Sequence, residues 1–326
     1  MDDVLVGVDL GGTSIKFGVG TSEGELLQTR SIPTDAHEGP QAVIQRIIST
    51  VDELARQTAK NIRGIGVGAP GLIDVKTGTT RFLPNLPTQW KDVGLGKPIS
   101  NHFACPVLVA NDARTATLGE LRFGYGRQQK NLTLAFFTLG TGVGGGVAIE
   151  GKLRLGKLGA AGELGHQTIE PNGLRCGCGN IGCLETIASG PAILGQAVRL
   201  MRSGQAPRLH EICNGDVGSV TIENLIEAVE KDDAIAEVIE RAAQAIGIAS
   251  ANVVTSIHPD LIVLGGGVAE IGSRLTEVVK KEITRRVQMF PTDNVEVVKS
   301  QLGVQAGILG AVALGLLATE NGLTIH

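Results

Sequence analysis

The stretch GVDLGGTSIK, residues 7–16, connects two short apolar runs through a turn rich in glycine. Val4 to Val8 has the pattern of a buried strand and Ile15 to Val19 that of the strand returning beside it, which predicts an opening β-hairpin. An acid ends the first strand, and two glycines, a hydroxyl and a lysine follow it. Such a turn can offer backbone N–H groups and a cation to a polyphosphate, although an ordinary hairpin has the same pattern.

The same design returns in the middle of the chain. Leu132 to Leu139 predicts a strand, GTGVGGG at 140–146 a turn, and Val147 to Ile149 the returning strand. Each hairpin opens a block in which strands later alternate with amphipathic helices, and this favours two similar α/β halves. The second hairpin strengthens the phosphate-binding interpretation of the first.

A third glycine turn, GGGV at 265–268, follows a predicted strand and precedes a helix, where close backbone can meet an adenine or a phosphate. The GxGxxG match at 140–145 opens no helix, and GVAIEGKL at 146–153 has Leu153 where a P-loop needs Ser or Thr. Neither is therefore interpreted as a dinucleotide site or a P-loop. The candidate nucleotide-binding residues of the three turns are Gly11, Gly12, Thr13, Lys16, Gly140, Thr141, Gly142, Gly265 and Gly266.

The remaining segments complete the α/β pattern, with residues 68–98 expected to be mostly loop. Further strands are expected at Ile62–Val67, Val107–Val109, Leu261–Leu264 and Val295–Val298, and helices at 40–60, 113–122, 185–203, 221–230, 234–256, 268–286 and 305–318.

The composition describes an ordinary soluble protein. With 326 residues, 42% hydrophobic content and a formal charge of −4, the chain lacks the basic excess that nucleic acid or an anionic membrane attracts. The longest apolar stretch, Val304 to Ala318, is short for a membrane span, and the N-terminus carries acids where a signal peptide needs cations. We expect a cytoplasmic protein without nucleic-acid or membrane partners.

GELGHQTIEPNGLRCGCGNIGCLE, residues 162–185, predicts a metal site. His166, Cys176, Cys178 and Cys183 can fold around one ion, and three thiolates with one imidazole suit Zn²⁺. Four protein ligands leave no open position for a reacting water, so the ion is interpreted as structural. The alternative is three reduced thiols in a core.

Seven motifs, in order and over nearly the whole chain, resemble the ROK family of sugar kinases and repressors. They are DLGGTSIK, GVGAPGLID, LPNLP, NDARTATLGE, TLGTGVGGGVAIEGKLRLGKLGAAGELGH, CGCGNIGCLE and LGGGVA. The resemblance implies an actin-like, ribonuclease-H-like ATPase fold of two α/β domains with an interdomain cleft, ATP and Mg²⁺ as cofactors, and a homodimer or higher homo-oligomer. We expect a small N-terminal domain over 1–112 and 305–326, and a large domain with the zinc-binding loop over 113–304.

Asp112 is the predicted general base. It follows a strand end and stands at the family's base position in NDARTATLGE, although Asn111 and Asp112 also suit the cap of the helix that follows. The resemblance implies that Asp9 holds Mg²⁺ through water and that Thr13 and Lys16 contact the phosphates of ATP. By the family pattern the sugar is bound by Gly71, Asn85, Asn111, Asp112, Glu163, His166 and Glu185.

The chain is therefore interpreted as a glucokinase, an ATP:hexose 6-phosphotransferase of carbohydrate metabolism and glycolysis. Alternatives are a kinase for N-acetylglucosamine, N-acetylmannosamine, mannose or fructose, a kinase that uses polyphosphate, and a non-catalytic ROK sugar sensor. Cys178 stands where the fructokinase branch tends to have His, which counts against fructose. A repressor would need a helix-turn-helix before the sugar domain, and the first hairpin already starts at residue 4.

Overall fold

The structure, a computed structural model, describes residues 3–82 and 90–320, and the chain divides into two compact units. Unit 1 comprises residues 1–132, 146–162 and 301–326, and unit 2 comprises 133–145 and 163–300. The C-terminal segment thus belongs to the same unit as the N-terminal one.

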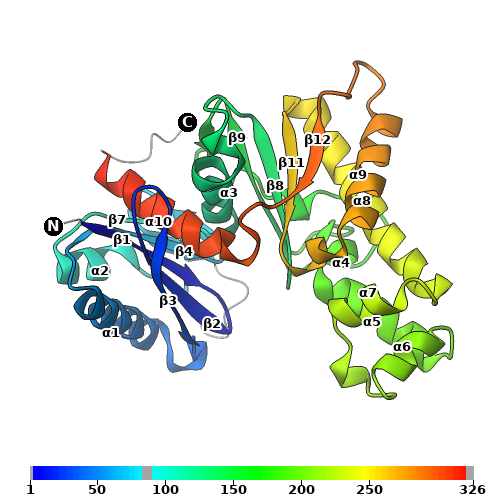
Figure 1. Cartoon of the computed structure of the whole chain (residues 1–326), viewed down its shortest axis with the longest axis horizontal. Coiled ribbons are helices and arrows are strands. Elements are labelled where there is room, and N and C mark those ends of the chain that lie inside the picture. The colour runs from blue at the N-terminus through cyan, green and yellow to red at the C-terminus, as the bar shows by residue number, and fades with distance from the viewer. Residues whose placement is uncertain (1–2, 83–89, 321–326) are drawn as a thin grey trace. The chain divides into compact units, whose positions relative to one another are not determined.

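Unit 1 is built on a five-stranded sheet in the order β3-β2-β1-β4-β7 (Figure 1). The predicted hairpin forms the antiparallel pair of β1 and β2, while β4 and β7 run parallel to β1. The strand bounds are β1 (Val4–Leu10), β2 (Ser14–Gly20), β3 (Leu26–Pro33), β4 (Ile62–Ala69) and β7 (Val107–Asn111).

The second sheet repeats this topology, in the order β10-β9-β8-β11-β12. In both sheets the hairpin strands occupy the same places in the order, and two parallel strands follow on the same side. The prediction of two similar α/β halves is therefore confirmed. The bounds are β8 (Leu134–Leu139), β9 (Val143–Ile149), β10 (Lys152–Arg154), β11 (Leu261–Gly265) and β12 (Glu296–Lys299).

The second hairpin turn is shorter than predicted. Only residues 140–142 turn, and the glycines that follow Val143 already belong to β9. A methyl group at Gly145 would lie 2.6 Å from Leu164 Cγ, and one at Gly146 would lie 2.2 Å from Thr117 Oγ1. These glycines serve close packing of a strand rather than the turn.

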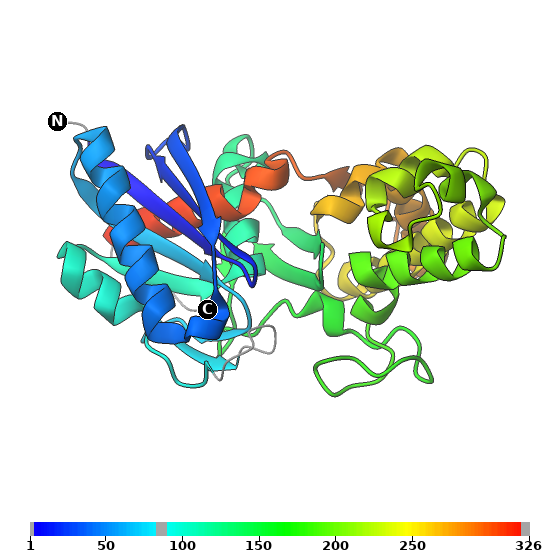
Figure 2. The same ribbon diagram turned by 90° about the horizontal axis from the view of Figure 1, so that it is seen from below.

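The helices cover both sheets. In unit 1, α1 and α2 lie on one face of the sheet and α10 on the other (Figure 1), and Figure 2 shows the helices of unit 2 (green to orange) gathered together. The bounds are α1 (Pro40–Thr58), α2 (Gly96–Phe103), α3 (Asp112–Phe123), α4 (Glu185–Ala188), α5 (Gly190–Arg202), α6 (Pro207–Ile212), α7 (Ile222–Ala228), α8 (Asp233–Ile257), α9 (Ser273–Arg286) and α10 (Ala306–Thr319).

Several segments differ from the sequence-based expectation. The helix expected at 185–203 is broken at Ser189, whose hydroxyl accepts from Ala192 N at 3.3 Å and caps α5. The expected loop at 68–98 contains β5 (Leu72–Asp74) and β6 (Thr79–Phe82), and α2 begins within it. The edge strand β3 and the short helix α6 carry weak patterns and were not predicted.

The apolar stretch near the C-terminus forms α10, which lies directly on the backbone of the first sheet. A methyl group at Gly7 in β1 would come within 2.6 Å of Ile308 O, and one at Gly66 in β4 within 2.0 Å of Ala311 O. The valines beside Gly7 point to the opposite face and join the core under α1. No helix among the described residues is long and apolar enough to cross a membrane.

Helix α3 crosses α10 at two glycines. A methyl group at Gly310 would lie 2.0 Å from Thr115 O, and one at Gly119 would lie 2.9 Å from Gly310 N. This packing explains why α3 belongs to unit 1, whereas the sequence-based boundary after residue 112 assigned it to the second domain. As a division into domains, 1–112 with 305–326 and 113–304 stays a prediction.

Replacement of Gly310 by Ala is expected to lower the free energy of unfolding by about 1–3 kcal/mol, because the new methyl group overpacks the helix crossing. Gly195→Ala is the matched control, since Gly195 lies exposed in α5 with no atom within 4 Å of an added Cβ. Gly195→Ala should raise the free energy of unfolding by about 0.5–1 kcal/mol, because alanine loses less backbone entropy than glycine when the helix forms. Urea unfolding of both variants checks this, and similar shifts in both would contradict the close crossing.

Candidate active site and metal centre

Polar residues of unit 1 meet at the carboxyl edge of its sheet. Asp9, near the end of β1, is in register with Gly68 of β4, and Ala69 of β4 is in register with Asn111, the last residue of β7. Ligands of parallel α/β sheets bind at this edge. The register therefore brings Asp9 and the Asn111–Asp112 pair to one edge, although a hundred residues of chain separate them.

Asp9 is half-buried between the hairpin and the first turn of α10. Its backbone pairs with that of Lys16 across the hairpin, and a methyl group at Gly307 would lie 2.5 Å from its Oδ2 atom. Burial raises the pKa of the Asp9 carboxyl, and the positive charge of Lys16 offsets part of this rise. A carboxylate in this position is stabilised by a further cation.

The turn between β1 and β2 is fixed at its base and exposed at its tip. Gly11 N donates to Ser14 O at 3.0 Å, and the buried hydroxyl of Thr34 donates to Gly11 O at 2.7 Å. Gly12 and Thr13 are exposed at the tip, and Lys16 is exposed on the returning strand. The turn thus has the rigid base and accessible tip that a phosphate-binding turn needs.

Asn111 caps α3. Its Oδ1 atom accepts from Ala113 N at 3.0 Å and from the Arg114 backbone N and Nη1 at 3.2 and 3.0 Å, while its Nδ2 donates to Gly71 O at 3.0 Å. Gly71 has a positive φ of 79°, which glycine adopts without strain. The cap anticipated from the sequence is therefore Asn111, and its bonds orient both Gly71 and the start of α3.

Asp112 is the first residue of α3 and is half-buried. Its Oδ1 atom accepts from Ala113 N at 2.8 Å, which fixes one carboxylate oxygen against the helix start. The structure thus brings Asp9, Gly71, Asn111 and Asp112 to the same edge. Asn85, predicted to contact the sugar, lies outside the described residues.

Arg114 is a residue that the sequence reasoning missed. Only 1% of it is exposed, and its guanidinium donates to Ala161 O at 2.9 Å and to Ala160 O at 3.0 Å, besides its bond to Asn111. A guanidinium with several fixed acceptors is well suited to hold backbone segments together. Arg114 joins the start of α3 to the loop that precedes Glu163, and its place beside Asn111 and Asp112 was the signal available in the sequence.

In unit 2 the two remaining glycine turns lie together. Gly265 at the end of β11 is in register with Thr138 of β8, and a methyl group at Gly266 would lie 2.4 Å from Leu139 O. Thr141 is exposed and Gly140 and Gly142 are half-buried in the hairpin turn, while Gly266 is exposed and Gly265 buried. The predicted nucleotide residues thus form two groups, one in each unit, each at the carboxyl edge of its own sheet.

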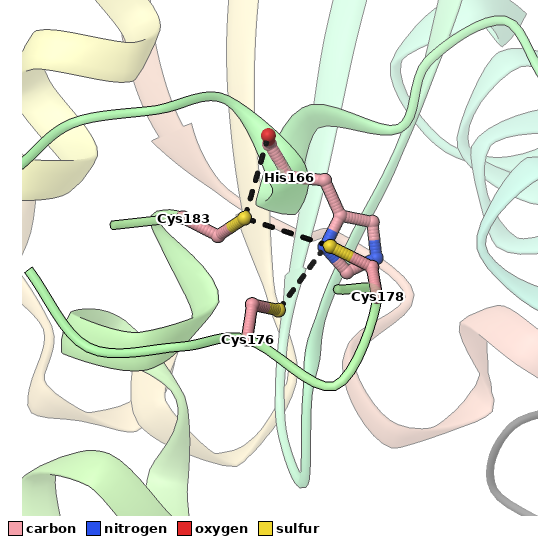
Figure 3. Close-up of side chains that lie close together, drawn as sticks. All are labelled: His166, Cys176, Cys178 and Cys183. Atoms are coloured by element: carbon pink, nitrogen blue, oxygen red, sulfur yellow. Dashed lines mark hydrogen bonds between the residues drawn. The ribbon is translucent and has the colours of Figure 1, made fainter. Parts of the chain in front are cut away.

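The four predicted metal ligands converge. One ligand atom from each of His166, Cys176, Cys178 and Cys183 can be chosen so that all lie within 4.8 Å of one another (Figure 3). Cys176 Sγ lies 3.6 Å from His166 Nδ1, and the sulfurs of Cys178 and Cys183 are 3.7 Å apart. A tetrahedral zinc site requires separations of about 3.6 Å and about 3.8 Å for these pairs, so the donor set fits such an ion.

The pKa values of the three thiols in this cluster are shifted in different directions. Burial raises the pKa of Cys176 to about 12 and raises that of Cys183. Burial acts in the same direction on Cys178, but hydrogen bonds from the Asn180 backbone and from the other two thiols lower its pKa overall. Three adjacent thiolates repel one another, and a divalent cation at their centre removes that repulsion.

The two acids at the ends of the cysteine loop have different surroundings. Exposed Glu163 places Oε2 3.8 Å from His166 Nε2, the ring nitrogen that does not face the thiols. Half-buried Glu185 accepts from Val143 N at 3.0 Å with Oε2, and from the Cys176 thiol at 3.4 Å with Oε1. Both acids therefore lie beside the cluster, and Glu185 also contacts the second glycine hairpin.

The sequence and the fold match known proteins over nearly their whole length. The model of the ROK family matches residues 5–317. The glucokinase of Halalkalibacterium halodurans is 35% identical over 314 residues, covering 95% of this chain and 94% of that protein. A ROK family glucokinase from Streptomyces griseus, solved in complex with glucose and AMPPNP, superposes with a TM-score of 0.83 at 32% identity, covering 96% of this chain and 99% of that one.

Sugar-responsive repressors also match. The xylose repressor of Caldicellulosiruptor bescii is 31% identical over 314 residues, which cover 95% of this chain and 77% of that protein. The similarity therefore includes both enzymes and regulators, and the chemistry of the site has to distinguish them.

Metal analysis of the purified chain is expected to find one divalent cation per chain. Cys178→Ser removes an exposed ligand without opening a core cavity, so it should lower the metal content and the thermal midpoint. Cys213→Ala, which removes a buried thiol outside the cluster, should keep the full metal content. Equal metal content in the wild type and Cys178→Ser would contradict the four-ligand site.

Proposed function

This chain belongs to the ROK family, and we propose that it is an ATP-dependent hexose kinase with glucose as its substrate. It has the actin-like α/β fold of two domains that the sequence predicted. The enzymatic interpretation is supported by the glucokinases among its relatives. Glucose is proposed as the substrate because these relatives are glucokinases and the Streptomyces griseus enzyme was solved with glucose bound.

One observation carries the proposal: Asp9 near the end of β1 and Asp112 directly after β7 lie at the same edge of one sheet, with β4 between those strands, and an exposed glycine turn follows Asp9. Phosphoryl transfer to a sugar needs an acid that holds a cation near the phosphates and a carboxylate that accepts the hydroxyl proton. A sensor that only binds sugar needs neither of them in this arrangement. This chemistry favours a kinase over a repressor-like sugar sensor.

In the proposed reaction the oxygen of the sugar 6-hydroxyl attacks the γ-phosphorus of ATP while Asp112 accepts the hydroxyl proton. The bond between the γ-phosphorus and the bridging oxygen breaks, and ADP leaves. The bond from Ala113 N fixes Asp112 Oδ1 at the start of α3 and so orients the carboxylate. Asp9, whose pKa is raised by burial, would hold Mg²⁺ through water, and the bound ion would neutralise charge on the phosphates. Thr13, Lys16 and the backbone of the three glycine turns would bind the phosphates and the adenine side of ATP.

The sugar would be held by polar side chains and backbone groups, which offer the directional hydrogen bonds that a polyhydroxylated ligand needs. We assign this role to Glu163, His166 and Glu185, which lie beside the cysteine cluster, to Gly71 and Asn111, which lie beside Asp112, and to Asn85. The cluster would hold a structural Zn²⁺, since its four protein ligands leave no position for a reacting water. With Nδ1 toward the thiols, His166 can present Nε2 to a sugar hydroxyl.

A panel of hexoses tests the proposal. ADP release is measured with glucose, mannose, fructose, N-acetylglucosamine and N-acetylmannosamine, and with either ATP or polyphosphate as phosphate donor. We expect the highest kcat/KM for glucose with ATP. Turnover of another sugar would correct the substrate, and binding of sugar without turnover of any of them would support the sensor instead.

Asp112→Asn is expected to lower kcat by about 10²–10⁴-fold while leaving glucose binding largely intact, because the amide keeps the shape of the side chain but cannot accept the proton. Steady-state kinetics and calorimetric glucose binding separate the two effects. The matched control is Asp233→Asn, since Asp233 is the exposed first residue of α8, the position that Asp112 occupies in α3. Near-normal kcat in Asp112→Asn would refute the general base.

A further inference from the structure

The hairpin turn of unit 2 is fastened by the segment that directly follows Cys183. Val143 N, at the end of the turn, donates to Glu185 Oε2 at 3.0 Å, and Gly140 O, at its start, accepts from Gly190 N at 2.8 Å. A methyl group at Gly142 would lie 2.5 Å from the same Glu185 oxygen. Both ends of the Gly140–Gly142 turn are thus attached to residues 185–190.

The other metal-ligating segment lies against the same strand. A methyl group at Gly165, next to His166, would lie 1.7 Å from Val143 O, so only a glycine permits this approach. Leu164 packs on Gly145 of β9. Val143 is therefore held at its N–H by Glu185, two residues after Cys183, and crowded at its carbonyl by Gly165, one residue before His166.

The connection between cluster and turn is short and rigid. Cys183 and Leu184 are fully buried, and Leu184 N donates to Gln167 O at 2.9 Å. Cys183 O accepts from Thr186 N at 3.0 Å and from Thr186 Oγ1 at 2.7 Å, which locks the first turn of α4 onto the ligand residue. A displacement of Cys183 must therefore move Glu185 as well.

We propose that Glu185 is a positioning residue for the Gly140–Gly142 turn and fixes it to the cysteine–histidine cluster. The cluster then orders a phosphate-binding turn in addition to the sugar loop. This inference rests on the proposed function, in which that turn binds the triphosphate. A turn that binds phosphate through backbone N–H groups works best when those groups are held in place before the ligand arrives.

Amide hydrogen exchange of Val143 tests the anchoring without any ligand. In the metal-loaded chain Glu185→Ala should speed this exchange about tenfold or more, the size expected when a bond to a charged acceptor is lost. Glu185→Gln retains an acceptor oxygen and should restore most of the protection. Gly142→Ala, which pushes on the carboxylate but keeps every cluster residue, should also speed the exchange.

Unchanged Val143 exchange in both Glu185→Ala and Gly142→Ala would overturn the proposal. If Glu185→Ala fails to fold, Gly142→Ala and removal of the metal from the wild type by a chelator provide the same readout. Glu170→Gln is the matched control, because Glu170 lies in the same loop and its carboxylate pairs with exposed Arg241 at 2.9 Å. It should leave the exchange unchanged.

The affinity for AMPPNP, measured without sugar, tests the consequence for nucleotide binding. Glu185→Ala and metal removal should each weaken it about tenfold, and together little more than either alone, because both release the same turn. If Glu185 only binds the sugar, Glu185→Ala should leave the affinity for AMPPNP unchanged, and that result would overturn the inference. Failure of the wild type to bind AMPPNP would instead refute the proposed function, while the exchange of Val143 would still report on the anchor.

Discussion

The close approach of α10 to the first sheet is the constraint on which unit 1 depends. Glycines in β1 and β4 have no side chains on the face of the sheet that α10 covers, so the backbone of α10 packs directly against the backbone of the strands. The same helix crosses α3 at Gly119 and Gly310. Because α10 begins beside Asp9 and α3 begins at Asp112, this packing positions the helix starts that border both acids. Dispersion contacts at such distances fix the elements tightly, since interiors tolerate little change in volume.

Backbone, rather than long side chains, carries most of the candidate chemistry. Two uses of glycine recur among the described residues of this chain. Some lie in strands and helices and allow elements to approach, as Gly7 and Gly310 do, whereas others form the turns at the carboxyl edges. The duplicated sheet topology places one hairpin turn at the same relative position in each half. Polyphosphate binding by N–H groups needs this exposure together with a rigid base.

Within unit 2, the cysteine–histidine cluster lies next to two candidate binding elements, the acid Glu163 and the second glycine hairpin. His166, one of its four residues, lies beside Glu163, which is a candidate for binding the sugar. Glu185, two residues after Cys183, accepts a hydrogen bond from the backbone of the hairpin. A structural ion is suited to such a place, since it ties together segments that have little apolar surface of their own. Between Cys176 and Cys183 the residues other than Cys178 are Gly and Asn, apart from Ile181, which is exposed, so this segment has no apolar core of its own.

The sequence alone determined most of the strands and helices and the residue types that the motifs contain. Strong local patterns sufficed for both hairpins and for the convergence of His166, Cys176, Cys178 and Cys183, because each depends on residues near one another in the chain. The tertiary structure alone decided which acids share an edge, that Asn111 rather than Asp112 caps α3, and that Arg114 holds the loop before Glu163. It also decided that Glu185 reaches Val143. These relations depend on sheet register and helix crossing, which bring together residues tens to hundreds of positions apart and leave no local signal in the sequence.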